Sequence, residues 1–218
     1  MCGELEDYGP FTFDTLKLYG HGGNDIFLAK YDLNGNVIWA IDAGSGESDK
    51  PNGVTYDAKG NIYITGHFSE TAKFGHLSLT TSSGRDVFIA KYSPDGVPLW
   101  VRSGGGGGTD VGLGIKADSA GNVYVAGVAG GGSTFNTTRL GGPGGSNAFL
   151  AKYNTNGDLI WIKNPGGYGH DEAGGVTLDT HGRVFIAGEY SGTAKFDGLS
   201  LKSAGGRDAF VACYTTSG

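Results

Sequence analysis

The chain has 218 residues, a formal net charge of −6 and glycine at 43 positions. Collagen needs glycine at every third position and a disordered linker lacks aromatic residues, so the 11% aromatic content predicts short strands joined by tight turns. Without clustered lysine or arginine, and without an apolar run of 18 residues, the sequence predicts neither nucleic-acid binding nor membrane insertion.

The predicted elements recur along the chain with a constant step of 61 residues. A strand of the pattern Asp/Asn-x-Phe-x-Ala-Lys/Cys-Tyr occupies residues 25–31, 86–92, 147–153 and 208–214. Other residue types keep the same step: Trp39, Trp100 and Trp161; Asp57, Asp118 and Asp179; Gly66, Gly127 and Gly188; Phe13, Phe74, Phe135 and Phe196. All these residues keep the same spacing, while the sequence between them differs from copy to copy. This combination indicates tandem repeats that have diverged.

One repeat, followed in chain order, contains four predicted strands. In the second copy these strands are 53–57, 61–66, 86–92 and 98–101, with turns at 58–60 and 93–96 and a longer connection through 73–79. A four-stranded meander cannot cover both of its faces alone, so stacked copies must bury them. The predicted fold is all-β: a β-propeller of four-stranded antiparallel blades, with a β-helix solenoid as the lesser alternative.

The whole chain, 1–218, is predicted to be a single repeat domain. The repeats span approximately 25–85, 86–146 and 147–207, with partial copies at 1–24 and 208–218. Counted by their third strands there are about four blades, of which the end blades are incomplete: the first lacks its first strand and the last lacks its fourth. Unpaired strand edges invite pairing, so self-association through these incomplete ends is predicted.

The two cysteines replace repeat residues at opposite ends of the chain. Cys2 stands where Tyr63 and Tyr124 stand, and Cys213 stands where Lys91 stands. We interpret them as a candidate disulfide, formed within one chain by ring closure or between two chains. Two unrelated thiols are the alternative.

The segment Gly114-Ile-Lys-Ala-Asp-Ser-Ala-Gly-Asn-Val-Tyr-Val-Ala-Gly127, with the Asp-x-Phe-x-Ala-Lys-Tyr strand and the Trp strand, resembles the SBBP-type bacterial β-propeller repeat family. The resemblance covers nearly the whole chain. It implies a building block of extracellular and surface proteins, and so a secreted or cell-surface location in a bacterium. The first ten residues lack the apolar core of a signal peptide.

Candidate binding residues are Asp49, Asp110 and Asp171, which precede each predicted first strand. In a propeller such entry loops lie near the axis, where several carboxylates could bind a cation or a sugar hydroxyl. The alternative is that each aspartate caps backbone N–H groups of its own loop. The tryptophans could stack on sugars, but their regular place within a strand favours core packing.

The sequence predicts no catalytic residues, no metal site and no cofactor. The Asx-Gly segments, such as Asp57–Asn61, lack the twelfth-position glutamate and flanking helices of a calcium-binding EF-hand and are interpreted as hairpin turns. No histidines share a repeat position or lie close to a cysteine, and no nucleophile motif is present.

These observations favour a non-catalytic β-propeller binding or scaffold module with an unknown protein or carbohydrate ligand. A lectin-like carbohydrate-binding propeller, a fragment or engineered segment of a larger propeller, and an enzyme with its site on the propeller axis are the alternatives.

Overall fold

The computed structural model describes residues 1–6, 9–81, 83–141 and 145–218. Strands, turns and irregular segments make up this part of the chain, and it contains no helix. The all-β prediction is therefore confirmed. All pairings between named strands are antiparallel, as expected for sequential meanders.

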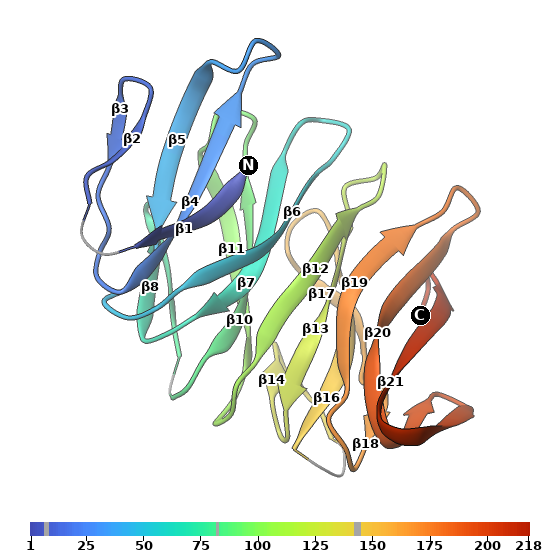
Figure 1. Cartoon of the computed structure of the whole chain (residues 1–218). Coiled ribbons are helices and arrows are strands. Elements are labelled where there is room, and N and C mark those ends of the chain that lie inside the picture. Colours follow the sequence, from blue (N-terminus) through green and yellow to red (C-terminus); the bar gives the residue numbers. More distant parts are fainter. Residues whose placement is uncertain (7–8, 82, 142–144) are drawn as a thin grey trace.

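Four larger sheets follow one another along the sequence, each corresponding to one copy of the repeat (Figure 1). The first sheet, in spatial order, is β1 (Cys2–Glu6), β4 (Asn24–Tyr31) and β5 (Val37–Ala43). The second contains β6 (Lys50–Tyr56), β7 (Ile62–Phe68), β10 (Asp86–Tyr92) and β11 (Pro98–Gly105). The third contains β12 (Val111–Ala117), β13 (Val123–Gly130), β16 (Ser146–Tyr153) and β17 (Leu159–Lys163). The fourth contains β19 (Glu172–Leu178), β20 (Arg183–Phe196) and β21 (Leu199–Thr215).

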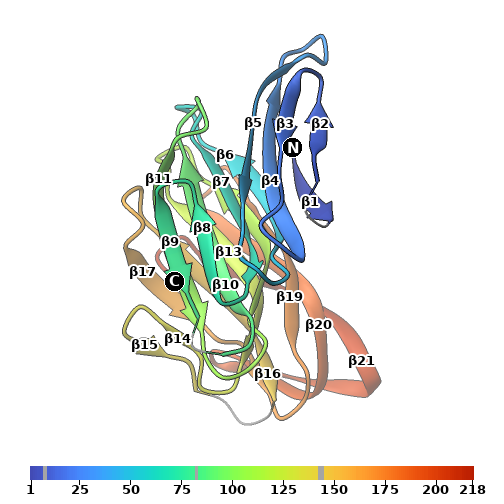
Figure 2. The same ribbon diagram turned by 90° about the vertical axis from the view of Figure 1, so that its left-hand side faces the viewer.

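The long connection between the second and third strand of each repeat forms a hairpin. The short hairpins are β2–β3 (Phe11–Phe13, Leu16–Leu18), β8–β9 (Thr71–Phe74, Leu77–Thr80) and β14–β15 (Thr134–Phe135, Thr138–Arg139). In the fourth sheet the outer halves of β20 and β21 take this place. The strands β8, β9, β14 and β15 lie on one face of the molecule (Figure 2).

Each of the later hairpins reaches back to the preceding sheet. Gly44 after β5 bridges to Lys73 in β8, and Gly105 in β11 pairs with Thr134 in β14. Gly166 in β18 (Gly166–Gly167) pairs with Lys195 in β20. These three contacts are again 61 residues apart, so the extra hairpin fastens each repeat to the one before it.

The turns inside each sheet follow the Asx-Gly pattern in the sequence. In the second sheet Asp57 Oδ1 accepts hydrogen bonds from the backbone N–H groups of Lys59 (2.9 Å) and Asn61 (3.0 Å). Gly60 adopts a φ of +78°, which residues with a Cβ atom rarely tolerate. The same bonds recur at Asp118 and Asp179, so the hairpin-turn prediction is confirmed.

The apolar core lies between successive sheets. Side chains of the second and third sheets, including Tyr63, Ile89 and Phe149, form one buried cluster, and similar clusters lie between the other neighbours. Successive sheets are closest at their first strands, β6, β12 and β19, which contact one another in this order. The distance between sheets increases toward their outer strands (Figure 1). The described residues form a row of sheets with the first and fourth at its ends and do not close into a ring.

Candidate functional site

The three predicted binding aspartates occupy equivalent places immediately before the first strand of a sheet. All three side chains are buried. Asp49 Oδ2 accepts hydrogen bonds from the backbone N–H (2.6 Å) and hydroxyl (2.7 Å) of Ser45, and Oδ1 accepts one from the backbone N–H of Ser69 (2.8 Å). This carboxylate therefore ties the linker that leaves the first sheet to the end of β7.

The same arrangement is found at the next two aspartates. Asp110 accepts hydrogen bonds from the backbone N–H groups of Gly106 (3.0 Å) and Gly130 (2.8 Å) and from the hydroxyl of Ser133. Asp171 accepts one from the backbone N–H of Gly167 at 2.7 Å. In the structure these carboxylates hold loops, and their role in binding a ligand stays a prediction.

A second position, which sequence reasoning missed, lies beside each of these aspartates, and it is acidic beside Asp49 and Asp110. Asp25, at the start of the third strand of the first sheet, faces Asp49 across Gly44. A Cβ atom on Gly44 would clash with Asp25 Oδ1 and lie 3.2 Å from Asp49 Oδ2, so only glycine leaves room for the pair. Asp86 and Asp110 are related in the same way across Gly105.

Burial governs the protonation of this first pair. It raises the pKa of Asp49 to about 6, with the nearby charge of Asp25 as a smaller contribution, and it also raises the pKa of Asp25. Asp25 Oδ1 is buried and accepts no hydrogen bond from the described residues. Two close buried carboxylates resist ionising together, so the Asp25 charge adds to the effect of burial on Asp49.

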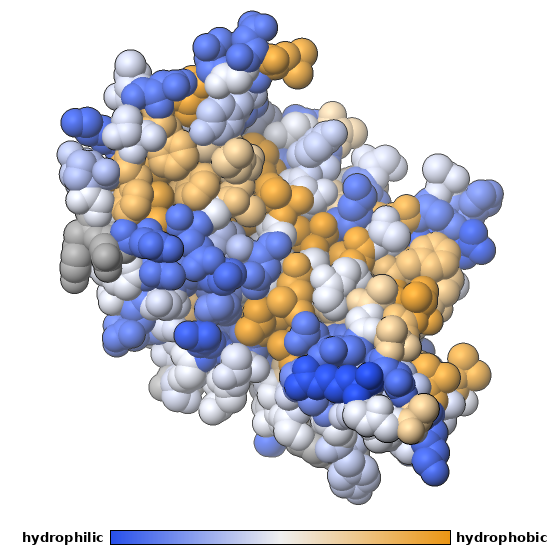
Figure 3. All heavy atoms as spheres, in the orientation of Figure 1, coloured by the Kyte–Doolittle hydropathy of each residue, from blue (hydrophilic) through white to orange (hydrophobic). Residues whose placement is uncertain are grey.

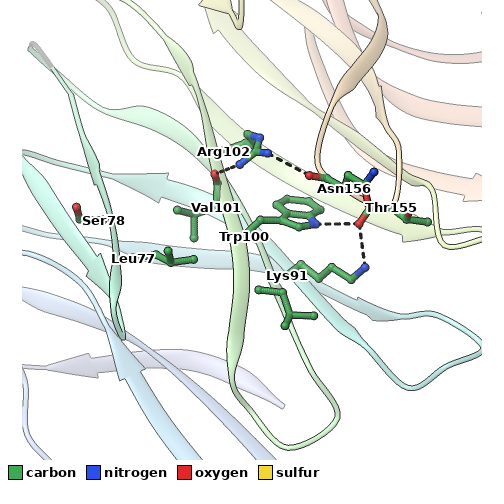
Figure 4. A pocket seen from close by; sticks show the side chains of 9 residues that line it. Leu77, Ser78, Lys91, Trp100, Val101, Arg102, Thr155 and Asn156 are labelled. Carbon is green, nitrogen blue, oxygen red and sulfur yellow. Dashed lines mark hydrogen bonds between the residues drawn. The ribbon is translucent and has the colours of Figure 1, made fainter.

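The tryptophans join neighbouring sheets, as Figure 4 shows for Trp100. Its indole Nε1 donates a hydrogen bond to the carbonyl oxygen of Thr155 (3.0 Å), and Lys91 Nζ donates to the same oxygen (2.9 Å). Thr155 belongs to the turn between β16 and β17 of the next sheet. The same clamp is formed by Lys30 and Trp39 on the carbonyl of Pro94, and by Lys152 and Trp161 on that of Thr216.

The tryptophans are not equally buried, which corrects the expectation of one uniform core position. Trp100 is 7% exposed, whereas Trp39 and Trp161 are half-buried. The difference arises next to the ring: the guanidinium of Arg102 stacks over Trp100, and Ile41 and Lys163 stand at the corresponding places.

A cavity of about 580 Å³ lies beside this clamp, lined by Leu77, Leu99, Arg102 and Asn156 among others (Figure 4). Arg102 donates hydrogen bonds to the carbonyls of Gly157 (2.8 Å) and Asn156 (3.1 Å). Trp100 is covered and its N–H is already used, so its ring face does not form a platform for a sugar.

A larger and more apolar groove of about 730 Å³ lies between the first and second sheets. It is lined by Met1, Tyr31, Leu33, Trp39, Val54 and Tyr56, together with Leu28, Ala29, Lys30, Thr55, Gly60 and Ile62. Val54 is 43% exposed and Tyr56 is 75% exposed. Figure 3 shows apolar residues gathered over this end of the molecule, near β1 and β4.

Both cysteines are free, so the predicted disulfide within one chain does not form in this structure. Cys2 lies in the first sheet and Cys213 in the fourth, and the two sheets lie at opposite ends of the row (Figure 1). The row does not close into a ring, which is what a bond within the chain would have required. A bond between two chains, and self-association through the end sheets, stay predictions.

One group of side chains with metal-binding chemistry lies at the entry to the fourth sheet. His170 Nε2 is 3.6 Å from Glu172 Oε2 and 4.0 Å from Glu189 Oε1. Sequence reasoning missed this group because it compared histidines only with each other and with cysteines. The repeat register would have placed residue 172 opposite residue 189, as residue 50 is placed opposite residue 67.

No family model matches the sequence. Two curated proteins are similar to it: an uncharacterized WD repeat-containing protein of Acanthamoeba polyphaga mimivirus, 28% identical over 173 residues, and the regulatory protein FlaEY of Caulobacter vibrioides, 27% identical over 171 residues. The matches cover 68% and 74% of this chain but only 12% and 17% of the relatives. No helix in the described ranges has the length and apolar character to cross a membrane.

Proposed function

We propose that this chain is a non-catalytic binding and scaffold module of the β-propeller type, and that its first sheet takes up an extended polypeptide strand. The repeat named in the mimiviral relative and the resemblance to SBBP repeats support the propeller assignment. The small share of each relative that is covered supports a module within a larger assembly. The SBBP resemblance also supports a secreted or bacterial cell-surface location.

The apolar groove beside β1 is the observation that carries the binding proposal. In the other three sheets a first strand, β6, β12 or β19, pairs antiparallel with the second strand and packs on its neighbours. In the first sheet β1 is the second strand of the repeat, and among the described residues it pairs only with β4. The groove lined by Val54 and Tyr56 lies beside Met1, at the start of this strand, and β1 packs on β6, which carries both residues.

The occupant proposed for this groove is a strand with the composition of the other first strands, which combine glycine with valine or isoleucine. Backbone hydrogen bonds to β1 would supply affinity, and alternate side chains would enter the groove. Close approach of backbones is already the rule at these positions, since a Cβ atom on Gly53 would lie 3.1 Å from Ile115 of the next sheet.

The test uses a fluorescent peptide with the sequence of Val111–Ala117 and a lysine tail for solubility, titrated with the purified chain while anisotropy is measured. We expect saturable binding, and none to a peptide that carries prolines at alternate positions, because proline removes the N–H groups that a strand partner needs.

Two exposed valines provide matched variants of the chain. Val54 lines the groove, whereas Val97 is 52% exposed and lies outside it. Val54→Asp is expected to weaken binding at least tenfold and Val97→Asp to leave it unchanged. Absence of binding to the unmodified chain, or equal binding by both variants, would refute strand addition at this groove.

The alternative functions are tested separately. A glycan array addresses the lectin-like alternative, and a panel of chromogenic ester, phosphate and glycoside substrates addresses catalysis. We expect no signal above buffer from either. Specific glycan retention, or turnover that Asp110→Asn abolishes, would replace the proposed function.

A further inference from the structure

The entry to the fourth sheet brings one imidazole and two carboxylates together. Glu172 in β19 and Glu189 in β20 are direct cross-strand partners, and His170 lies two residues before Glu172. All three side chains are partly exposed, so an ion from solution can reach them. Like charges directly opposite each other in an antiparallel pair destabilise it, so this arrangement has a cost.

The same pair of positions is occupied differently in the other sheets. In the third sheet Val111 faces Val128, an apolar pair. In the second sheet Lys50 faces His67, and Lys50 Nζ pairs with Glu4 Oε1 at 2.8 Å. Of the three sheets in which this cross-strand pair is described, the fourth is therefore the one with two acidic residues opposite each other.

His170 is held in place before any ion arrives. Its backbone N–H donates a hydrogen bond to the hydroxyl of Ser191 (2.9 Å), and its ring Nδ1 lies 3.1 Å from Ser146 Oγ. In the tautomer whose Nδ1–H donates to Ser146 Oγ, the lone pair of Nε2 faces the two glutamates, and metal-ligating histidines are usually oriented in this way, through a hydrogen bond donated by the other ring nitrogen.

We propose that His170, Glu172 and Glu189 form a structural or regulatory binding site for a divalent zinc-type metal ion. The three ligand atoms lie within 4.8 Å of one another. Tetrahedral zinc ligands at about 2.0–2.1 Å from the ion lie about 3.3–3.4 Å apart, so small side-chain rotations bring these atoms into its shell. The imidazole favours zinc over calcium and magnesium, which prefer oxygen ligands alone.

Arg207 makes the proposal sharper because it competes with the ion. Its guanidinium pairs with Glu189 Oε1, and it is positively charged. An ion that takes this oxygen must displace the guanidinium or share the carboxylate with it. If the group binds a metal ion, removing the positive charge of Arg207 therefore strengthens metal binding. If the group is only a cluster of ion pairs, the same change removes one of those pairs and produces no metal binding.

The experiment titrates the folded chain with zinc chloride at pH 7.5 by calorimetry and follows the melting temperature in parallel. Both cysteines are first replaced by serine, because thiols also bind zinc. We expect one zinc ion per chain, a rise in melting temperature with zinc concentration, and no comparable effect of calcium or magnesium.

Variants decide whether these residues hold the ion. His170→Gln is expected to weaken zinc binding at least tenfold, Arg207→Gln to strengthen it several-fold, and His181→Gln, which alters an exposed histidine outside the group, to leave it unchanged. Circular dichroism confirms that each variant is folded. Absence of saturable zinc binding, equal binding by His170→Gln and the parent, or weaker binding by Arg207→Gln would overturn the proposal.

Discussion

The joint between the first and second sheets and the joint between the third and fourth sheets use the same backbone with different side chains. In both, an aspartate that enters the next sheet, Asp49 or Asp171, accepts a hydrogen bond from the loop that leaves the preceding sheet. Its neighbour across the glycine is Asp25 in the first joint and Asn147 in the second.

The difference lies in the number of buried carboxylates, two in the first joint and one in the second, since the arrangement of the backbone is shared. Gly44 and Gly166 adopt nearly the same φ, +156° and +152°. Where Asp25 faces Asp49, burial raises both pKa values, and the nearby carboxylate adds to the shift of Asp49. An amide at Asn147 removes one titrating group and can donate its own hydrogen bond. Burial also raises the pKa of Asp171, which faces this amide, but no second carboxylate lies across the glycine there.

The largest effect is expected from the clamp that all joints share. Trp100→Ala should lower the free energy of unfolding by roughly 3–5 kcal/mol, because it empties a buried aromatic position between two sheets. Trp161→Ala should cost less, since that side chain is half-buried. Guanidinium denaturation of both variants measures the difference. Equal losses would mean that the cover provided by Arg102 does not matter.

The next effect tests the comparison directly by exchanging the two joints. Asp25→Asn should stabilise the chain at pH 7.5 by about 1–2 kcal/mol, because it removes the need to bury two carboxylates together. Asn147→Asp should destabilise it by a similar amount. Urea denaturation at fixed pH measures both. A loss of stability in Asp25→Asn would show that the bonds which Asp25 accepts from His21 and Gly22 outweigh the repulsion.

A smaller effect is the pH dependence of the first joint. The pKa of Asp49 is about 6 in the folded chain, above its usual value of 3.8. A raised folded pKa contributes stability that is present below the unfolded value and is lost as pH rises through the folded value. Asp25→Asn removes the raised pKa of Asp25 itself and its smaller contribution to the pKa of Asp49, so between pH 4 and pH 7 the stabilisation relative to the unmodified chain should grow. Denaturation of both proteins at several pH values isolates this contribution, because other carboxylates titrate equally in both.

The sequence predicted the repeat, its strands and its turns because each depends on local chemistry. Asp57 closes its turn with its own neighbours, and the Asp-x-Phe-x-Ala-Lys-Tyr segments are short apolar runs between turns, as strands buried on both faces are. Contacts between repeats were beyond such reasoning. The bond from Lys91 to Thr155 spans 64 residues, and the pairing of Asp25 with Asp49 depends on how two sheets approach each other. The 61-residue step shows which residues occupy equivalent positions, but it does not show which residues are in contact.

The two cysteines extend the comparison to the ends of the row, and here the expected effect is smallest. Burial raises the pKa of the Cys2 thiol, so little of it is present as the reactive thiolate at neutral pH, whereas Cys213 is exposed. Iodoacetamide should modify Cys213 faster than Cys2, as followed by mass spectrometry of tryptic peptides.

Because Cys213 is the more exposed and more reactive thiol, any disulfide between two chains is expected to form through Cys213. On a non-reducing gel after mild oxidation, Cys213→Ser should abolish the dimer and Cys2→Ser should retain it. Loss of the dimer only in Cys2→Ser would place the contact at the first sheet instead.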